Sequence, residues 1–190
     1  MKSTRFVFGR ALAVLCALLF VSFGFMSCQQ EDDDNGLPDG VYELSDNSAL
    51  IGTWVNSYSG GTSVYKITSS TFDNSGTSSY NGTTSTYDSY AGNNLVVSYT
   101  NDEETSGYIY IKYTRAYCST HSDSTTYIYD EDAADVGKWY AIAFKELTAS
   151  SVSLSGAYGT VSSTSTLEEA ISTFTIDNGY FSTYSECVKQ

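Results

Sequence analysis

Two neighbouring stretches decide the fold: KWYAIAFKE at residues 138–146 and VSLSGAY at residues 152–158. Large apolar side chains occupy alternate positions in both of them: Tyr140, Ile142, Phe144, Val152 and Leu154. Because successive side chains of a β-strand point to opposite faces of the sheet, this period of two predicts strands with one buried face. The two stretches therefore predict an antiparallel hairpin.

The same alternation recurs earlier in the chain, in three further apolar pairs: Tyr65 and Ile67, Leu95 and Val97, Ile109 and Ile111. Turn signals such as Asn81-Gly82 separate such segments, and Pro38 is the single proline, so nothing interrupts the hydrogen-bond ladders of the expected strands. About eight antiparallel strands avoid exposed edges by closing into a barrel. The sequence therefore predicts an all-β, up-and-down barrel, with a β-sandwich as the alternative.

One short helix is expected near the C-terminus. The segment Thr166-Leu167-Glu168-Glu169 has the Thr and Glu spacing of a capping box. Apolar residues continue from it at helical spacing as far as Phe174, which gives the helix one apolar face. We expect a last strand to follow over residues 175–181.

The N-terminus has the pattern of a secretory signal peptide. Lys2, Arg5 and Arg10 carry positive charge, and residues 11–25 are almost entirely apolar. This apolar run is shorter than the roughly 20 residues that a membrane-spanning helix needs. We therefore expect a cleaved signal peptide rather than a transmembrane helix.

The residues that follow, Phe25-Met26-Ser27-Cys28, resemble the lipobox of bacterial lipoproteins. The resemblance implies cleavage between Ser27 and Cys28, followed by lipid attachment to Cys28. More than one acyl chain anchors a protein stably to a membrane. We accordingly expect a protein of the cell envelope, held at the outer membrane and facing either the surface or the periplasm, with this covalent lipid and no cofactor.

The residues after the lipobox, QQEDDDNG at 29–36, are polar and acidic and are expected to stay disordered. The predicted organisation is a signal peptide at 1–27, an acidic tether at 28–47 and a barrel domain at 48–190. Residues 1–27 hold three of the nine basic residues and none of the 22 acidic ones, which leaves a formal net charge of −16. So acidic a protein is a poor partner for nucleic acid.

Two cysteines remain once the signal peptide is removed and Cys28 is lipidated. They are Cys118 and Cys187. Because the cell envelope is oxidising, these two residues are candidates for a disulfide, and the sequence leaves their pairing open.

Gly52-Thr53-Trp54 resembles the Gly-x-Trp signature of the lipocalin and calycin barrels. The resemblance implies that Trp54 packs across the closed end of the barrel and that the C-terminal helix packs outside it. It also implies a pocket for a small hydrophobic ligand, with these residues as candidates: Trp54, Tyr65, Val97, Ile111 and Phe144. A filled barrel without a ligand is the alternative, because side chains alone can fill an eight-stranded interior.

No pattern of catalytic residues is recognisable, and we expect a protein that is not an enzyme. His121 is the single histidine, and its neighbours in sequence do not form a triad or a metal site. The alternative to ligand binding is a surface adhesin or a module that binds a host or envelope protein or a glycan. It would use Tyr108 and Tyr110, which alternate with Ile109 and Ile111 and are therefore expected to be exposed.

Overall fold

Strands make up most of the chain in the computed structural model, which describes residues 36–119 and 128–190. The elements are β1 (Tyr42–Glu43), β2 (Gly52–Tyr58), β3 (Gly61–Ile67), β4 (Phe72–Tyr80), β5 (Thr83–Tyr99), β6 (Gly107–Tyr117), β7 (Tyr129–Asp130), β8 (Trp139–Lys145), β9 (Ser151–Gly156), α2 (Leu167–Thr173) and β10 (Ser185–Lys189). All of them belong to one compact unit, residues 37–190.

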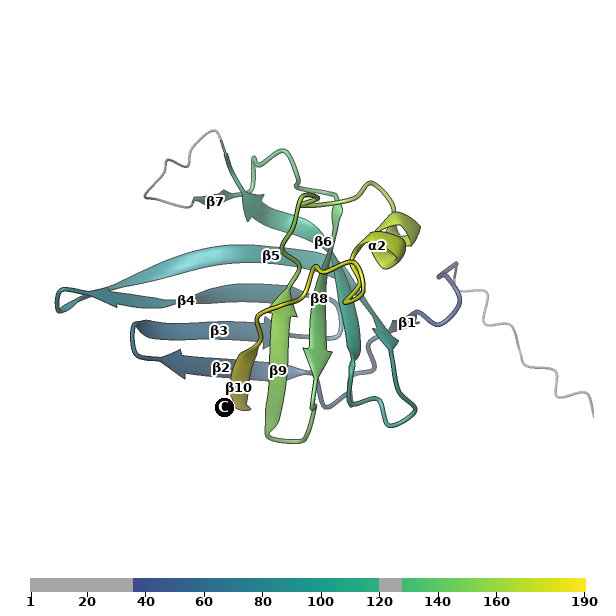
Figure 1. The fold of residues 1–190 in the computed structure, drawn as a ribbon, viewed down its shortest axis with the longest axis horizontal. Helices are drawn as coiled ribbons and strands as arrows, with labels where there is room; N and C mark the ends of the chain where they lie inside the picture. The colour runs from purple at the N-terminus through teal and green to yellow at the C-terminus, as the bar shows by residue number, and fades with distance from the viewer. Residues whose placement is uncertain (1–35, 120–127) are drawn as a thin grey trace, which may run out of the picture. The chain divides into compact units, whose positions relative to one another are not determined.

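Eight of these strands close into an antiparallel barrel, as the alternating pattern predicts. Around the barrel they follow their order in the chain: β2, β3, β4, β5, β6, β8, β9 and β10 (Figure 1). The last strand closes the ring on the first, with Val188 opposite Val55. The predicted up-and-down barrel is confirmed, and the alternative of two packed sheets is not formed.

The domain begins earlier than the sequence predicts, because residues 37–47 belong to the compact unit rather than to a tether. β1 pairs with β5, and the side chains of Val41 and Leu44 on either side of β1 are buried. Only residues 29–36 have the acidic, polar composition on which the tether was predicted. Residues 37–44 contain enough apolar side chains to pack against the barrel.

The barrel encloses one core, built from the inward side chains of all eight strands. Val97, Ile111 and Phe144 are at most 2% exposed within it. Trp54 is fully buried at one end, where its indole N–H donates to the carbonyl of Leu50 at 2.7 Å. The predicted inward face of the strands and the burial of Trp54 are confirmed.

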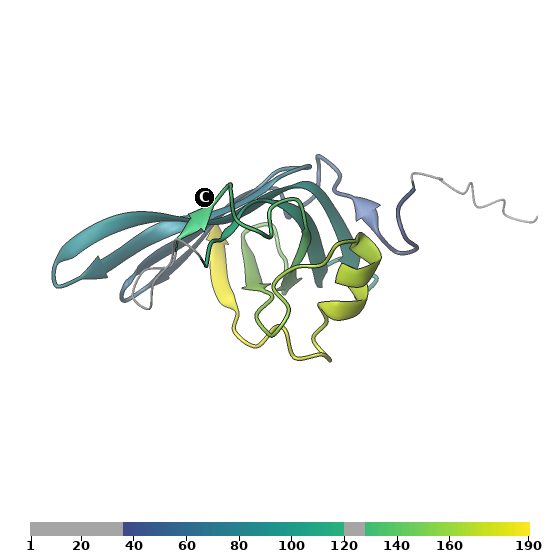
Figure 2. The ribbon, with the colours of Figure 1, turned by 90° about the horizontal axis from the view of Figure 1, so that it is seen from above.

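A second core lies outside the barrel, between its wall and α2 (Figure 2). The helix begins at Thr166 with the predicted capping box. Its apolar face and the segment after it bury Phe174 and Phe181 against the outer side of β6 and β8. Among the residues that the structure describes, no helix has the length and apolar character needed to cross a membrane.

This second core overturns the expected exposure of Tyr108 and Tyr110. Tyr110 is 1% exposed, and Tyr108 is half-buried against Phe181 with its hydroxyl accepting from the backbone N–H of Ile176 at 3.2 Å. Residues 175–181 do not form the predicted last strand, because this segment covers Tyr108 and Tyr110. The last strand is β10 instead.

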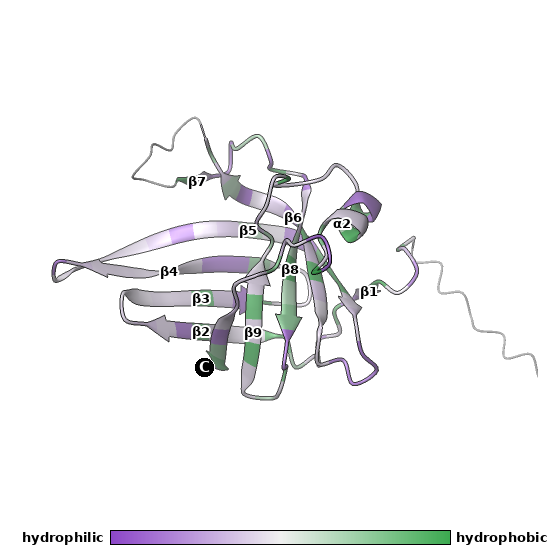
Figure 3. Ribbon diagram, in the orientation of Figure 1, coloured by the Kyte–Doolittle hydropathy of each residue, from purple (hydrophilic) through white to green (hydrophobic). Residues whose placement is uncertain are grey.

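The β2–β3 and β4–β5 hairpins extend beyond the closed ring (Figure 1). β10 pairs with β2 only as far as Val55, and β6 pairs with β5 only as far as Ala91. The outer parts of β4 and β5 are hydrophilic or of intermediate hydropathy, whereas hydrophobic residues recur along β8 and β9 (Figure 3). Asn81-Gly82 forms the predicted turn, with φ of 50° and 77°, a left-handed conformation that suits these two residues.

Candidate functional site

The two ends of the barrel are built differently, and the end near Trp54 is closed. Residues 44–51 lie against this end and supply the buried side chains of Leu44 and Leu50. The C-terminal strand holds the same segment, since the ammonium of Lys189 donates to the carbonyl of Ala49 at 3.0 Å. This segment and Trp54 therefore act as a plug.

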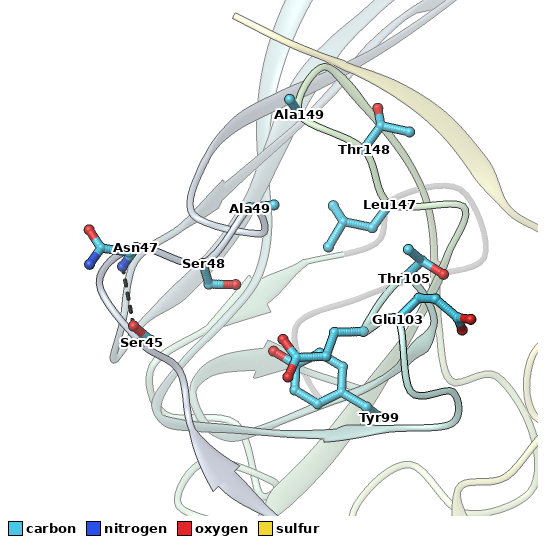
Figure 4. Close-up of a pocket in the computed structure, with 11 residues that line it drawn as sticks. Ser45, Asn47, Ser48, Ala49, Tyr99, Glu103, Thr105, Leu147, Thr148 and Ala149 are labelled. Atoms are coloured by element: carbon cyan, nitrogen blue, oxygen red, sulfur yellow. Dashed lines mark hydrogen bonds between the residues drawn. The ribbon is translucent and has the colours of Figure 1, made fainter.

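A cavity of about 390 Å³ lies at the closed end, between residues 45–49 and the turns that follow β5 and β8 (Figure 4). Its wall combines Tyr99 and Leu147 with Glu103, Glu104 and several small polar side chains. None of the predicted ligand-binding residues Trp54, Tyr65, Val97, Ile111 and Phe144 lines this polar cavity.

The opposite end carries a second cavity, which we call the mouth cavity. It has a volume of about 330 Å³ and is lined by Tyr90, Tyr113, Ala116, Tyr117, Tyr129, Asp135, Tyr140, Ala157, Tyr158, Gly159, Val161 and Ser162. Tyr113 and Tyr117 belong to the last part of β6 and Tyr140 to the first part of β8. Because β6 and β8 are antiparallel, these positions share the end of the barrel away from Trp54.

Three tyrosines, Tyr90, Tyr113 and Tyr140, form the inner wall of this cavity, and we call them the mouth tyrosines. Their rings make mutual contacts, with centroids 4.8 Å apart for Tyr113 and Tyr140, 5.2 Å for Tyr90 and Tyr140, and 6.4 Å for Tyr90 and Tyr113. Aromatic pairs at such distances stabilise one another by about 0.5–1.5 kcal/mol beyond the burial of their area. The inner wall is therefore a packed aromatic surface.

The adjoining strand β9 leaves room for these rings at Gly156. A Cβ atom at this position would lie 2.6 Å from the hydroxyl oxygen of Tyr140 and 3.0 Å from that of Tyr90. The Tyr140 hydroxyl donates to the carbonyl of Ala157 at 2.9 Å. A side chain at position 156 would therefore displace the hydroxyl groups of Tyr140 and Tyr90.

The mouth tyrosines are neutral at physiological pH. Burial raises the pKa of all three phenols well above the ordinary value of 10.0, and repulsion between neighbouring phenolates raises it further. They form a neutral aromatic surface, and they do not offer an anionic nucleophile.

Asp135 supplies the charged group among the described residues that line the mouth cavity. Its carboxylate accepts from the hydroxyls of Ser162 at 2.7 Å and Ser163 at 2.8 Å, and from the ammonium of Lys138 at 3.0 Å. Burial raises the pKa of this carboxyl, but the three donors outweigh burial and the pKa is lowered. Asp135 is therefore ionised, and it ties the segment before β8 to residues 162–163.

The predicted ligand-binding residues lie together in the barrel core and not around the mouth cavity. Trp54, Tyr65, Val97, Ile111 and Phe144 are all buried there, and the Tyr65 hydroxyl donates to the hydroxyl of Ser185 at 3.0 Å. None of the five lines the mouth cavity. Side chains fill the barrel at their level, so the open space lies nearer the mouth.

The mouth tyrosines were missed as a site, although the sequence contains a signal for two of them. Tyr113 continues the phase of Ile109 and Ile111, and Tyr140 shares the phase of Ile142, so the period of two places both rings inside. Tyr90 has no such signal. Register shifts in the β5–β6 ladder beyond it, between Ala91 and Val96, interrupt the alternation.

Cys118 and Cys187 are both buried thiols, and no bond joins them in the structure. The thiol of Cys187 donates to the carbonyl of Ser185 at 3.3 Å, and burial raises its pKa to about 12. Cys118 follows the end of β6, whereas Cys187 lies on β10. The two strands are not neighbours in the barrel, so the fold does not itself bring the two backbones together.

Other predicted sites fall outside the described residues. They are the cleavage and lipidation positions Ser27 and Cys28; His121, for which no site role is predicted, also lies outside the described residues. Within residues 36–119 and 128–190, no group of three or more His, Cys, Asp or Glu side chains is placed to hold a metal ion.

Comparisons of the chain with protein-family models, curated proteins and solved structures gave no match. The closed eight-stranded barrel with one short helix is compatible with the lipocalin-like fold that Gly52-Thr53-Trp54 suggests.

Proposed function

We propose that this protein is a lipid-anchored, non-catalytic protein of the cell envelope that binds a small apolar ligand in the mouth cavity. The observation that carries the proposal is the cavity itself. It has a volume of about 330 Å³ and six tyrosine rings in its lining, at the end of the barrel that the plug does not close. A concave, largely aromatic site with a few polar groups is the usual character of a small-molecule site.

The wall of the mouth cavity combines rigid and exposed parts. The mouth tyrosines are held by the barrel core, since the ring of Tyr90 stacks on Phe72 at a centroid distance of 5.7 Å. At the rim, Tyr117 and Tyr158 are 44% and 86% exposed. Rigid aromatic groups bind with a small loss of conformational entropy, so the inner wall favours binding. The rim rings supply further apolar area for a ligand to cover.

The ligand site lies near the mouth rather than at the centre of the barrel. Val97, Ile111 and Phe144 are buried in the core, and none of them lines the mouth cavity. The inner wall of that cavity consists of the mouth tyrosines. A ligand small enough for this space is expected to bind without displacing the core. The lipid anchor at Cys28 supports a place in the envelope, and it rests on the lipobox resemblance.

Two valine substitutions test the proposal. Val161 lies in the lining of the mouth cavity and is 37% exposed, whereas Val188 lies on β10 and is 57% exposed. Val161→Trp fills the cavity, and Val188→Trp adds the same ring elsewhere on the surface. Calorimetric titration with the neutral probe 4-tert-butylphenol should show binding to the wild type and to Val188→Trp, with a loss of at least tenfold for Val161→Trp. Equal affinity in all three proteins would contradict the proposed site.

A further inference from the structure

We propose that the mouth cavity selects an organic cation, an ammonium group carried on a small apolar body. This inference rests on the proposed function, because it names the class of ligand that the same cavity binds. It depends on the charges in the lining, on the tyrosine ring faces, and on cation–aromatic contacts that the protein already makes.

The charges around the mouth cavity disfavour an anionic ligand. Asp135 is ionised and paired with Lys138, and the described residues of the lining include neither lysine nor arginine. Lys138 is held by Asp135, and Arg115 forms an ion pair with Asp73 at 2.9 Å. A carboxylate or phosphate ligand would therefore lose its hydration without gaining a cationic partner in the lining, which is costly. The whole chain has a formal net charge of −13, which also attracts cations.

The tyrosine rings supply the short-range attraction. The face of an aromatic ring carries negative potential and attracts a cation within about 6 Å of its centroid. The rings of Tyr90 and Tyr140 meet at 66° in the inner wall, and those of Tyr117 and Tyr129 meet at 67° nearer the rim. At the rim, Tyr158 is 86% exposed, so its ring surface is accessible to a cation in the cavity.

The same attraction is already used elsewhere in this structure. The ammonium groups of Lys112, Lys145 and Lys189 lie 5.5, 4.5 and 5.0 Å from the ring centroids of Trp139, Tyr184 and Trp54. In each case a lysine of the chain covers the ring. None of these lysines lines the mouth cavity, so a cation from outside could take the corresponding place over its tyrosines.

Three probes of nearly equal size and shape distinguish the effect of ligand charge on affinity from the effect of apolar contact. They are phenyltrimethylammonium, its neutral carbon analogue tert-butylbenzene, and the anion benzenesulfonate. Each is titrated against the full chain in lipid nanodiscs, with empty nanodiscs as the blank. We expect phenyltrimethylammonium to bind at least fivefold more tightly than tert-butylbenzene, although the neutral compound is more hydrophobic. Benzenesulfonate should bind most weakly.

Variants at the rim test whether ring faces are responsible. Tyr158→Leu should reduce the affinity for phenyltrimethylammonium about threefold, whereas Tyr158→Phe, which keeps the ring face, should leave it unchanged. Tyr80→Leu is the control, because Tyr80 is 79% exposed at the end of the β4–β5 hairpin and lies outside the mouth cavity. An equal loss in the Phe and Leu variants would mean that the hydroxyl acts instead, and would overturn the role of the ring.

The outcomes distinguish this inference from the proposed function. If tert-butylbenzene or benzenesulfonate binds as tightly as the cation, and Val161→Trp abolishes that binding, the cavity binds ligands but does not select cations. If Val161→Trp changes the binding of no probe, the proposed function fails and the inference fails with it. Preference for the cation that is lost in Val161→Trp and kept in Val188→Trp supports both.

Discussion

Replacement of Trp54 by phenylalanine tests the plug at the closed end of the barrel. Phenylalanine keeps an aromatic ring but removes the indole N–H that donates to the carbonyl of Leu50 at 2.7 Å. Trp54 and Leu50 are both fully buried, so in the variant the Leu50 carbonyl loses its hydrogen-bond donor. An unsatisfied buried carbonyl lowers the free energy of unfolding by about 1–3 kcal/mol. The side chain is also smaller by roughly 40 Å³, which adds about 1 kcal/mol at about 24 cal/mol per Å³ of cavity.

The expected loss in the free energy of unfolding is therefore about 2–4 kcal/mol. Urea denaturation of residues 37–190 measures it, and the slope with urea should stay constant. Trp139→Phe is the control, because Trp139 is only half-buried and its ring lies beside Lys112, and it should lose less than about 1 kcal/mol. Binding of 4-tert-butylphenol at the other end should persist in both variants. If Trp54→Phe is no less stable than Trp139→Phe, the account of the plug is wrong.

Three further predictions concern the second core, the mouth tyrosines and the anchor. Phe174→Ala empties a fully buried position under α2 and should lower the free energy of unfolding by about 3–5 kcal/mol, measured by the same urea titration. The raised pKa of the mouth tyrosines means that the folded state holds their protons more tightly than the unfolded state. Their contribution to stability should therefore be complete below about pH 10 and be lost as the pH rises above it, and an ultraviolet titration should show them ionising after the exposed tyrosines. Cys28→Ala should prevent lipid attachment, so recovery of this variant from the membrane as a fully lipidated species would contradict the lipobox interpretation.

The barrel could be predicted from the sequence because its strands bury one face along most of their length. The alternation at Ile109 and Ile111 and at Ile142 and Phe144 indicates both the strands and their inward side. The capping box at Thr166 likewise fixes the start of α2 through local hydrogen bonds alone. Such signals depend on neighbours in the sequence and can be read without the fold.

The second core could not be predicted in the same way. Tyr110 and Ala143 lie on the outer face of their strands, and residues from α2 and the segment after it bury them. Nothing within β6 or β8 indicates that a segment more than 20 residues further along the chain will cover this face. For the same reason, Tyr108 and Tyr110 were predicted to be exposed.

The position of the mouth cavity also depends on the fold. Both Val97 and Tyr113 point inward, and the alternating pattern does not say which level of a barrel is filled. The large side chains of Phe144 and Trp54 are buried in the core, and the space remains beside the mouth tyrosines. Only the register between strands shows which inward residues lie at the same height along the barrel axis.

Native mass spectrometry of the protein released gently from its own envelope tests the central claim most directly. We expect a small molecule to accompany the wild type and the Val188→Trp variant and to be absent from Val161→Trp, whose new ring fills the mouth cavity. A bare chain in all three proteins, or an adduct that Val161→Trp retains, would contradict a ligand site at the mouth of the barrel.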